Sequence, residues 1–124
     1  MSLDLVGPFT VQVGEYPNTD AELITSPVQG VITDVGLKYT FDEGSSLDID
    51  IVTGGNVGPA QDVLHLSGSN TDGWYHPRVA LQDTNGGDLT GQNTNGIPVY
   101  DTVSIAISNG GAGDRLDVWF ILQT

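Results

Sequence analysis

Apolar and polar residues alternate with a period of two along most of this chain, which is typical of β-strands with one buried face. The longest alternating segment, residues 31–41, is followed by the turn Asp42–Ser45 and by a second alternating segment, residues 47–51. We expect the two segments to form a β-hairpin with one face in water. Its apolar face would carry Val31, Thr33, Val35, Leu37, Tyr39, Phe41, Leu47, Ile49 and Ile51, and its wet face would include Asp48 and Asp50.

The last third of the chain repeats this pattern. Residues 103–108 alternate, the loop Asn109–Asp114 turns the chain, and residues 116–122 alternate back, which predicts a second hairpin. Trp119 and Ile121 fall on the face opposite Leu116, Val118, Phe120 and Leu122. A strand that is apolar on both faces is either central to the domain or covered by another subunit.

Shorter strands are expected at Phe9–Glu15, Glu22–Ser26, Gln61–Ser67 and Trp74–Gln82, and no window has helical periodicity. Long loops are expected at Thr53–Ala60 and Asp83–Gly96. The sequence therefore predicts an all-β fold, a single antiparallel β-sandwich or jelly-roll-like barrel of about eight strands. It would be one domain over residues 1–124, with residues 1–8 as a candidate extended N-terminal arm.

Charge narrows the functions that fit this fold. Sixteen acidic residues stand against three basic ones, and the net charge is −13. This excess argues against binding to nucleic acid and to anionic membranes, because few cations are present to neutralise phosphates. It fits high ionic strength or a cationic partner, although an ordinary acidic protein has the same property. No segment is apolar enough to span a membrane and the start lacks signal-peptide features, so we expect a soluble, non-secreted protein.

Candidate chemistry is sparse. The chain has no cysteine, and neither His65 nor His76 lies near a nucleophile motif, so we expect no catalytic residue, no cofactor and no metal. Asp48 and Asp50 are explained as the polar face of a strand. The segment Asp83–Asp88 is similar to a calcium loop, but the EF-hand register fails because Asp88 stands where glycine is required. A turn is the favoured interpretation, and a non-EF calcium site stays open.

Four segments carry a family resemblance: Ser69–Val79, Asp83–Gly91, Ile97–Tyr100 and Val103–Gly111. In this order they resemble small structural proteins of tailed viruses that decorate or cement the head. The resemblance covers roughly the last sixty residues well and the first sixty only by strand pattern. It implies a β-sandwich or jelly-roll that forms trimers or dimers over capsomer junctions. The acidity is similar to that of proteins from viruses of salt-loving hosts.

We therefore expect a non-enzymatic virion protein on the capsid surface, a homo-oligomer with a trimer as the favoured state, which bridges subunits of the major capsid protein. The expected interface residues are Trp74, Tyr75, His76 and Arg78, with Trp119 and Ile121 toward a sister subunit and Leu3, Leu5, Val6 and Phe9 in the arm.

The alternative hypothesis is a carbohydrate-binding β-sandwich module or a virion spike that contacts the host surface. Trp74, Tyr75 and Trp119 would then stack on sugar rings, and the loop Asp83–Asp88 would hold calcium. An acidic hydrolase is a third hypothesis, which no motif supports.

Overall fold

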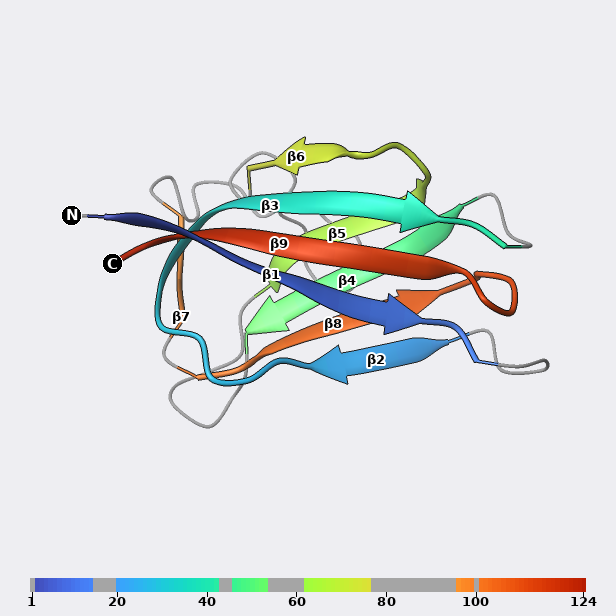
Figure 1. The fold of residues 1–124 in the computed structure, drawn as a ribbon, viewed down its shortest axis with the longest axis horizontal. Helices are drawn as coiled ribbons and strands as arrows, with labels where there is room; N and C mark the ends of the chain where they lie inside the picture. The colour runs from blue at the N-terminus through green and yellow to red at the C-terminus, as the bar shows by residue number, and fades with distance from the viewer. Residues whose placement is uncertain (1, 15–19, 43–45, 54–61, 77–95, 100) are drawn as a thin grey trace.

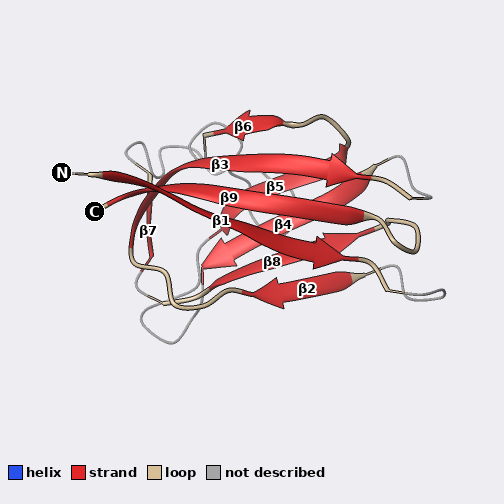
Figure 2. Cartoon of the chain, in the orientation of Figure 1, coloured by secondary structure: helices blue, strands red, loops and turns tan. Residues whose placement is uncertain are grey.

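The computed structural model describes residues 2–14, 20–42, 46–53, 62–76, 96–99 and 101–124, which form nine β-strands in two antiparallel sheets packed against each other (Figures 1 and 2). The strands are β1 (Leu3–Gln12), β2 (Ala21–Ile24), β3 (Gly30–Thr40), β4 (Leu47–Thr53), β5 (Asp62–Ser69), β6 (Gly73–Tyr75), β7 (Ile97–Val99), β8 (Val103–Ser108) and β9 (Arg115–Gln123). Within these residues, no helix is long and apolar enough to cross a membrane.

The strand order is that of a jelly roll. One sheet has the order β1-β9-β3-β6, with β7 also paired to β3, and the other has the order β2-β8-β4-β5. The first strand thus pairs with the last, β2 with β8, β3 with β6 and β4 with β5, as if one long hairpin were wound into two sheets. The predicted all-β sandwich is confirmed, and β7 is a strand that the sequence pattern did not predict.

The core lies between the sheets and is built from the apolar side of each alternating strand. Leu47, Ile49 and Ile51 of β4 face Leu116, Val118 and Phe120 of β9, and the side chains of all six are fully buried. Burial of each such side chain stabilises the fold by about 1.5–3 kcal/mol. The rest of the buried core consists of Val11, Val13, Val28, Ile32, Val35, Leu37, Tyr39, Val63, Leu64, Ile97, Val99, Val103, Ile105, Ile107 and Leu122.

Both predicted hairpins are wrong in their pairing. Strands β3 and β4 belong to different sheets, and so do β8 and β9, so each turn carries the chain from one sheet to the other. The apolar and polar faces of β4, β8 and β9 are as predicted, because a hairpin and a crossing between sheets bury the same alternate residues. Alternation fixes which face is buried and not which strand supplies the hydrogen bonds.

The predicted alternation of β3 is wrong at its start, because the strand contains a β-bulge. Against β9, Ile32 pairs with Leu122 but Asp34 pairs with Ile121, so one extra residue is inserted at Thr33. Ile32 is therefore fully buried together with Val35, whereas Val31 is displaced from the face on which it was predicted.

The predicted N-terminal arm is corrected by strand β1, which begins at Leu3 and pairs with β9 along its length, from Leu3 opposite Gln123 to Gln12 opposite Arg115. A bulge between Val6 and Phe9 turns both of these side chains toward the core, and the Phe9 ring lies 5.7 Å from that of Phe120. Val6 and Phe9 are thus partly buried and pack against the core instead of extending as part of an arm. The insertion at Gly7-Pro8 hides this alternation in the sequence.

Asp114 joins the loop between β8 and β9 to the end of β3. Its side chain is fully buried, and its carboxylate accepts hydrogen bonds from the backbone N–H groups of Asp42 (2.8 Å) and Gly111 (2.9 Å). Its own carbonyl accepts the N–H of Val13 at 2.9 Å. One buried residue therefore fixes three segments at this end of the sandwich.

We predict that Asp114→Ala lowers the free energy of unfolding by about 2–4 kcal/mol, because two backbone N–H groups lose a charged acceptor whose own side chain is fully buried. Denaturant unfolding monitored by circular dichroism measures this loss. Asp4→Ala, which removes an exposed carboxylate, is the control and should change the stability by less than about 0.5 kcal/mol. An equal effect of the two substitutions would contradict this role for Asp114.

Candidate docking surface

The outer side of the sheet β1-β9-β3-β6, called here the front face, carries five of the ten predicted interface residues. Gly36 of β3 pairs with Trp74 of β6 on one side and with Trp119 of β9 on the other. Residues that pair across antiparallel strands lie on the same face of a sheet. The front face therefore has a row of Trp74, Gly36 and Trp119 running across three strands.

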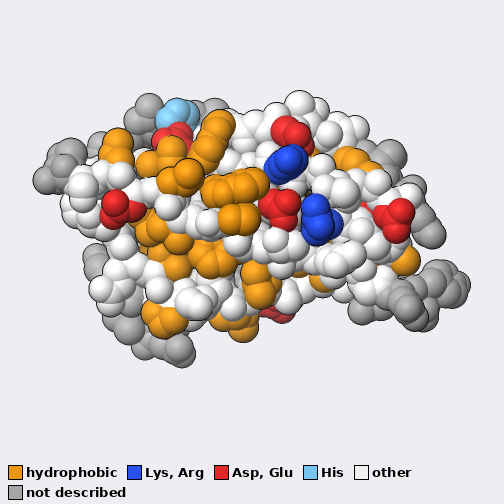
Figure 3. Space-filling view, viewed as in Figure 1, with side chains coloured by type: hydrophobic (Ala, Val, Ile, Leu, Met, Phe, Trp, Pro, Cys, Tyr) orange, Lys and Arg blue, Asp and Glu red, His pale blue; other side chains and the backbone are white. Residues whose placement is uncertain are grey.

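A second row lies one step along the strands. Ile121 of β9 pairs with Leu5 of β1 and with Asp34 of β3, and Leu3 lies on the same face two residues before Leu5. We call Leu3, Leu5, Trp74, Trp119 and Ile121 the apolar cluster. Figure 3 shows hydrophobic side chains gathered on this face, with Lys and Arg side chains beside them.

Three of the five members of the apolar cluster are exposed, and Trp119 and Ile121 are half-buried. Among the described residues the exposed large hydrophobic side chains are Leu3 and Leu5 (65% each), Trp74 (55%) and Ile24 (63%). Three of these four belong to the apolar cluster, and Ile24 lies on β2 in the other sheet. Single exposed apolar residues need no explanation, but several gathered on one face mark a binding surface.

Gly36 makes room for the Trp74 ring. A Cβ atom at position 36 would lie 2.8 Å from ring atoms of Trp74, which is too close for ordinary contact. The indole therefore lies over the backbone of β3, and a depression of about 320 Å³ opens beside it, lined by Leu5, Gly36, Leu37, Lys38, Asp72, Gly73, Trp74 and Trp119. Its walls thus hold two indoles, and its rim holds one amine and one carboxylate.

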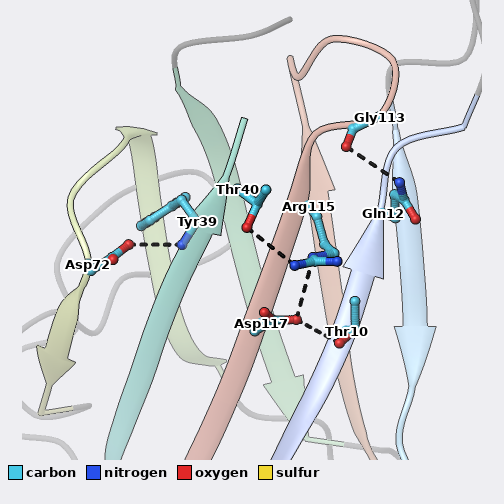
Figure 4. A network of polar contacts seen from close by, with 8 residues as sticks. All are labelled: Thr10, Gln12, Tyr39, Thr40, Asp72, Gly113, Arg115 and Asp117. Atoms are coloured by element: carbon cyan, nitrogen blue, oxygen red, sulfur yellow. Dashed lines mark hydrogen bonds and ion pairs between the residues drawn. The ribbon is translucent and has the colours of Figure 1, made fainter. Parts of the chain in front are cut away.

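The other half of the front face is polar (Figure 4). Asp117 of β9 accepts a 2.6 Å hydrogen bond from the hydroxyl of Thr10 and lies 3.9 Å from Nε of Arg115. Arg115 in turn donates to Oγ1 of Thr40 at 3.4 Å. These contacts cross from β1 to β9 to β3. They give the apolar cluster a polar border. This border contains both basic residues that the structure describes, Arg115 and Lys38, and Lys38 is the residue of β3 that pairs with Asp117.

His76 lies at another edge of the apolar cluster. Its Nδ1 atom is 2.8 Å from Oδ1 of Asp34, the residue opposite Ile121. The contact ties the end of β6 to β3, because Trp74 and His76 belong to the same short segment. His76 thus positions the strand that carries Trp74.

The outer side of the sheet β2-β8-β4-β5, the back face, has the opposite character. Its hollow of about 510 Å³ is lined by Asp20, Glu22, Asp48, Asp50 and His65 together with Ala21, Ile49, Ala106, Ile107 and Ser108. Asp48 accepts hydrogen bonds from the N–H of Gly68 (2.8 Å) and from Nδ2 of Asn109, so it has a structural role. In the part of the chain that the structure describes, no group of three or more His, Asp or Glu side chains could hold a metal ion.

The structure brings together half of the predicted interface residues. Trp74, Trp119, Ile121, Leu3 and Leu5 share the front face, and His76 borders it. Tyr75 is a correction: it pairs with Val35, packs against the core and donates its hydroxyl to the carbonyl of Thr71 at 3.4 Å. Arg78 and the loop Asp83–Asp88 lie outside the described residues.

Sequence reasoning missed Gly36, Lys38 and Asp34 as parts of this surface. All three fall on the polar side of the pattern in residues 31–42, a side that was taken to face only water. The apolar character of Trp119 and Ile121 on the neighbouring strand was the available signal, because a strand next to them had to contribute to the same surface.

No protein-family model matches this chain, and neither a curated protein nor a solved structure matches it.

We predict that Gly36→Ala keeps the fold but displaces the Trp74 indole, because the new Cβ would overlap the ring. The measurement is the tryptophan emission of a Trp119→Phe background, in which Trp74 is the remaining tryptophan. The emission maximum should shift in Gly36→Ala. Gly73→Ala is the matched control, since a Cβ there meets nothing within 4 Å. Identical spectra for both variants would contradict the stacked position of Trp74.

We also predict that the melting temperature rises with sodium chloride concentration. The net charge is −13, and the ion pairs among the described residues are Arg115–Asp117 and two that need a protonated histidine, Asp34–His76 and Asp50–His65. Screening therefore relieves more repulsion than attraction. Thermal melts in low and high salt test this, and a constant or lower midpoint in high salt would contradict it.

Proposed function

We propose that the protein is a non-enzymatic structural component of a virus particle, a decoration or cement protein that binds the outside of an assembled capsid as a homo-oligomer. The observation that carries this proposal is the apolar cluster on the front face. Five apolar side chains from three strands lie together on the front face of a protein whose net charge is −13. A surface of this kind serves binding rather than chemistry.

The mechanism is attachment without catalysis. A protein that binds the assembled shell and not its separated subunits stabilises the shell by mass action. The rigid sandwich presents the front face in a fixed shape, so little conformational entropy is lost on docking. The major capsid protein is the proposed partner. The acidic back face would remain in solvent, where it suits a particle that works at high salt.

The sequence resemblance to head proteins of tailed viruses supports the same function. Three of the four segments that carry it lie wholly or partly on the described strands β5, β6, β7 and β8. The jelly-roll order is one of the architectures that capsid proteins use, but the same order also serves lectins and cupins, so the fold alone does not choose.

A carbohydrate-binding module or a host-contacting spike is the second candidate, and one observation favours it. Trp74 and Trp119 flank the depression beside Gly36, with Lys38 and Asp72 at its rim. Two indole rings with hydrogen-bonding groups beside them suit the apolar faces and the hydroxyls of a sugar. A spike would be present in few copies per particle, whereas a decoration protein would be present in hundreds.

We predict that the double variant Leu5→Ala/Trp74→Ala rebinds stripped virus particles at least about tenfold more weakly than the wild type, because truncation of buried interface anchors commonly costs more than 1.4 kcal/mol. Ile24→Ala is the control, since Ile24 is exposed to the same degree on the other sheet. Cosedimentation with stripped particles measures the binding. Failure of the wild type to rebind would refute the decoration function, and equal rebinding of all three proteins would remove the front face from it.

A further inference from the structure

We infer that the depression beside Trp74 holds an arginine side chain of the capsid partner, which stacks on the indole of Trp74 and donates hydrogen bonds to the carboxylate of Asp72. The inference rests on the proposed function and names the chemistry that the partner presents to the front face. The arginine belongs to the same contact as the apolar cluster, so one partner covers the whole face.

The indole of Trp74 lies flat on β3 and turns one face outward. Three adjacent atoms of its six-membered ring, Cη2, Cζ3 and Cε3, lie 2.8, 2.8 and 3.0 Å from the position that a Cβ at Gly36 would occupy. A ring that met this position edge-on would bring fewer of its atoms so close, so the ring covers Gly36 with one face. Trp74 is 55% exposed, and its other face is directed away from the sheet. The face of an indole attracts cations more strongly than that of any other side chain.

Asp72 provides a fixed carboxylate at the rim of the same depression. Its Oδ1 accepts the backbone N–H of Tyr39 at 2.9 Å, which holds the side chain against β3 (Figure 4). Asp72 and Trp74 are two residues apart, and both line the depression of about 320 Å³. A guanidinium is planar and carries five N–H donors, so it can stack on an indole and donate to a carboxylate at the same time. The ammonium of lysine is a strongly hydrated point charge and fits this pair of groups less well.

The charge of the protein favours a cationic partner. The net charge is −13, and on the front face the carboxylates outnumber the two described basic residues, Lys38 and Arg115. These carboxylates are those of Asp34, Asp72 and Asp117. A basic partner surface is therefore drawn toward this face. Lys38 also lines the depression, and its amine opposes a second cation there. A cationic occupant and an anionic one consequently respond to the loss of Lys38 in opposite directions.

Titration of the full chain with the peptide acetyl-Gly-Arg-Gly-amide tests the inference. Two-dimensional NMR follows the indole N–H resonance of Trp74, which the variant Trp119→Phe assigns because it leaves Trp74 as the remaining tryptophan. The control peptide carries citrulline, which has nearly the shape of arginine but no charge. We expect the arginine peptide to shift the Trp74 resonance, and the citrulline peptide to bind about threefold more weakly or worse, because it lacks the cation.

Three variants test the sign of each charge. Asp72→Asn should raise the dissociation constant of the arginine peptide about threefold or more, and Lys38→Gln should lower it. Asn at position 72 keeps an oxygen for the N–H of Tyr39. Glu22→Gln on the back face is the matched control, because it removes the same charge away from the depression, and its effect should be smaller than that of Asp72→Asn. Equal binding of the two peptides, equal effects of Asp72→Asn and Glu22→Gln, or weaker binding to Lys38→Gln would each overturn the inference.

Particle rebinding separates the arginine site from the decoration function. At concentrations that saturate Trp74, the arginine peptide should displace the wild type from stripped particles and the citrulline peptide should not. Rebinding that the arginine peptide does not reduce refutes the capsid arginine and leaves the decoration function in place. Failure of the wild type to rebind, with the arginine peptide still bound at Trp74, refutes the decoration function and leaves the arginine site in place.

Discussion

The position of β9 between β1 and β3 is the constraint on which the rest of the structure depends. This last strand pairs along both of its edges, so its hydrogen bonds are satisfied within the sheet and its two faces decide what is buried. Leu116, Val118, Phe120 and Leu122 form the centre of the core, and the alternate positions Trp119 and Ile121 must then lie on the front face. The strand that fills the centre of the core thereby also places two apolar side chains on the front face, beside those of β1 and β6.

The fold class was predictable because alternation with a period of two survives in nearly every strand, and the buried sides of β4, β8 and β9 follow from it directly. The sheet partners were not predictable. Leu47, Ile49 and Ile51 are buried equally well by a hairpin or by a crossing to the second sheet, so the pattern holds no information on which occurs. β-Bulges are the second reason why the sequence pattern did not predict the structure in full. The extra residue at Thr33 moved Ile32 into the core, and the one at Gly7-Pro8 concealed that β1 begins at Leu3.

The candidate surface was predictable at Trp119 and Ile121, because these two apolar residues break the alternation of their strand. It was not predictable where an aromatic residue could equally belong to the core or to an interface. Trp74 and Tyr75 are neighbours in the sequence, yet strand geometry sends Trp74 to the front face and Tyr75 to the core. Composition alone could not separate them. Gly36 had no signal of its own, because its role is to leave space for the indole on the next strand, and that contact exists only in the folded sheet.

The front face and the back face of the sandwich differ in charge. A uniformly acidic sandwich would stay apart from its own copies, and a uniformly apolar one would aggregate. Here Lys38 and Arg115 border the apolar cluster on one face, while Asp20, Glu22, Asp48 and Asp50 line the hollow on the other. High salt weakens the electrostatic repulsion between the carboxylates of this acidic protein. The back face keeps its hydrated carboxylates under the same conditions. The distribution of charge therefore separates a face that has basic residues beside its apolar side chains from a face whose hollow is acidic.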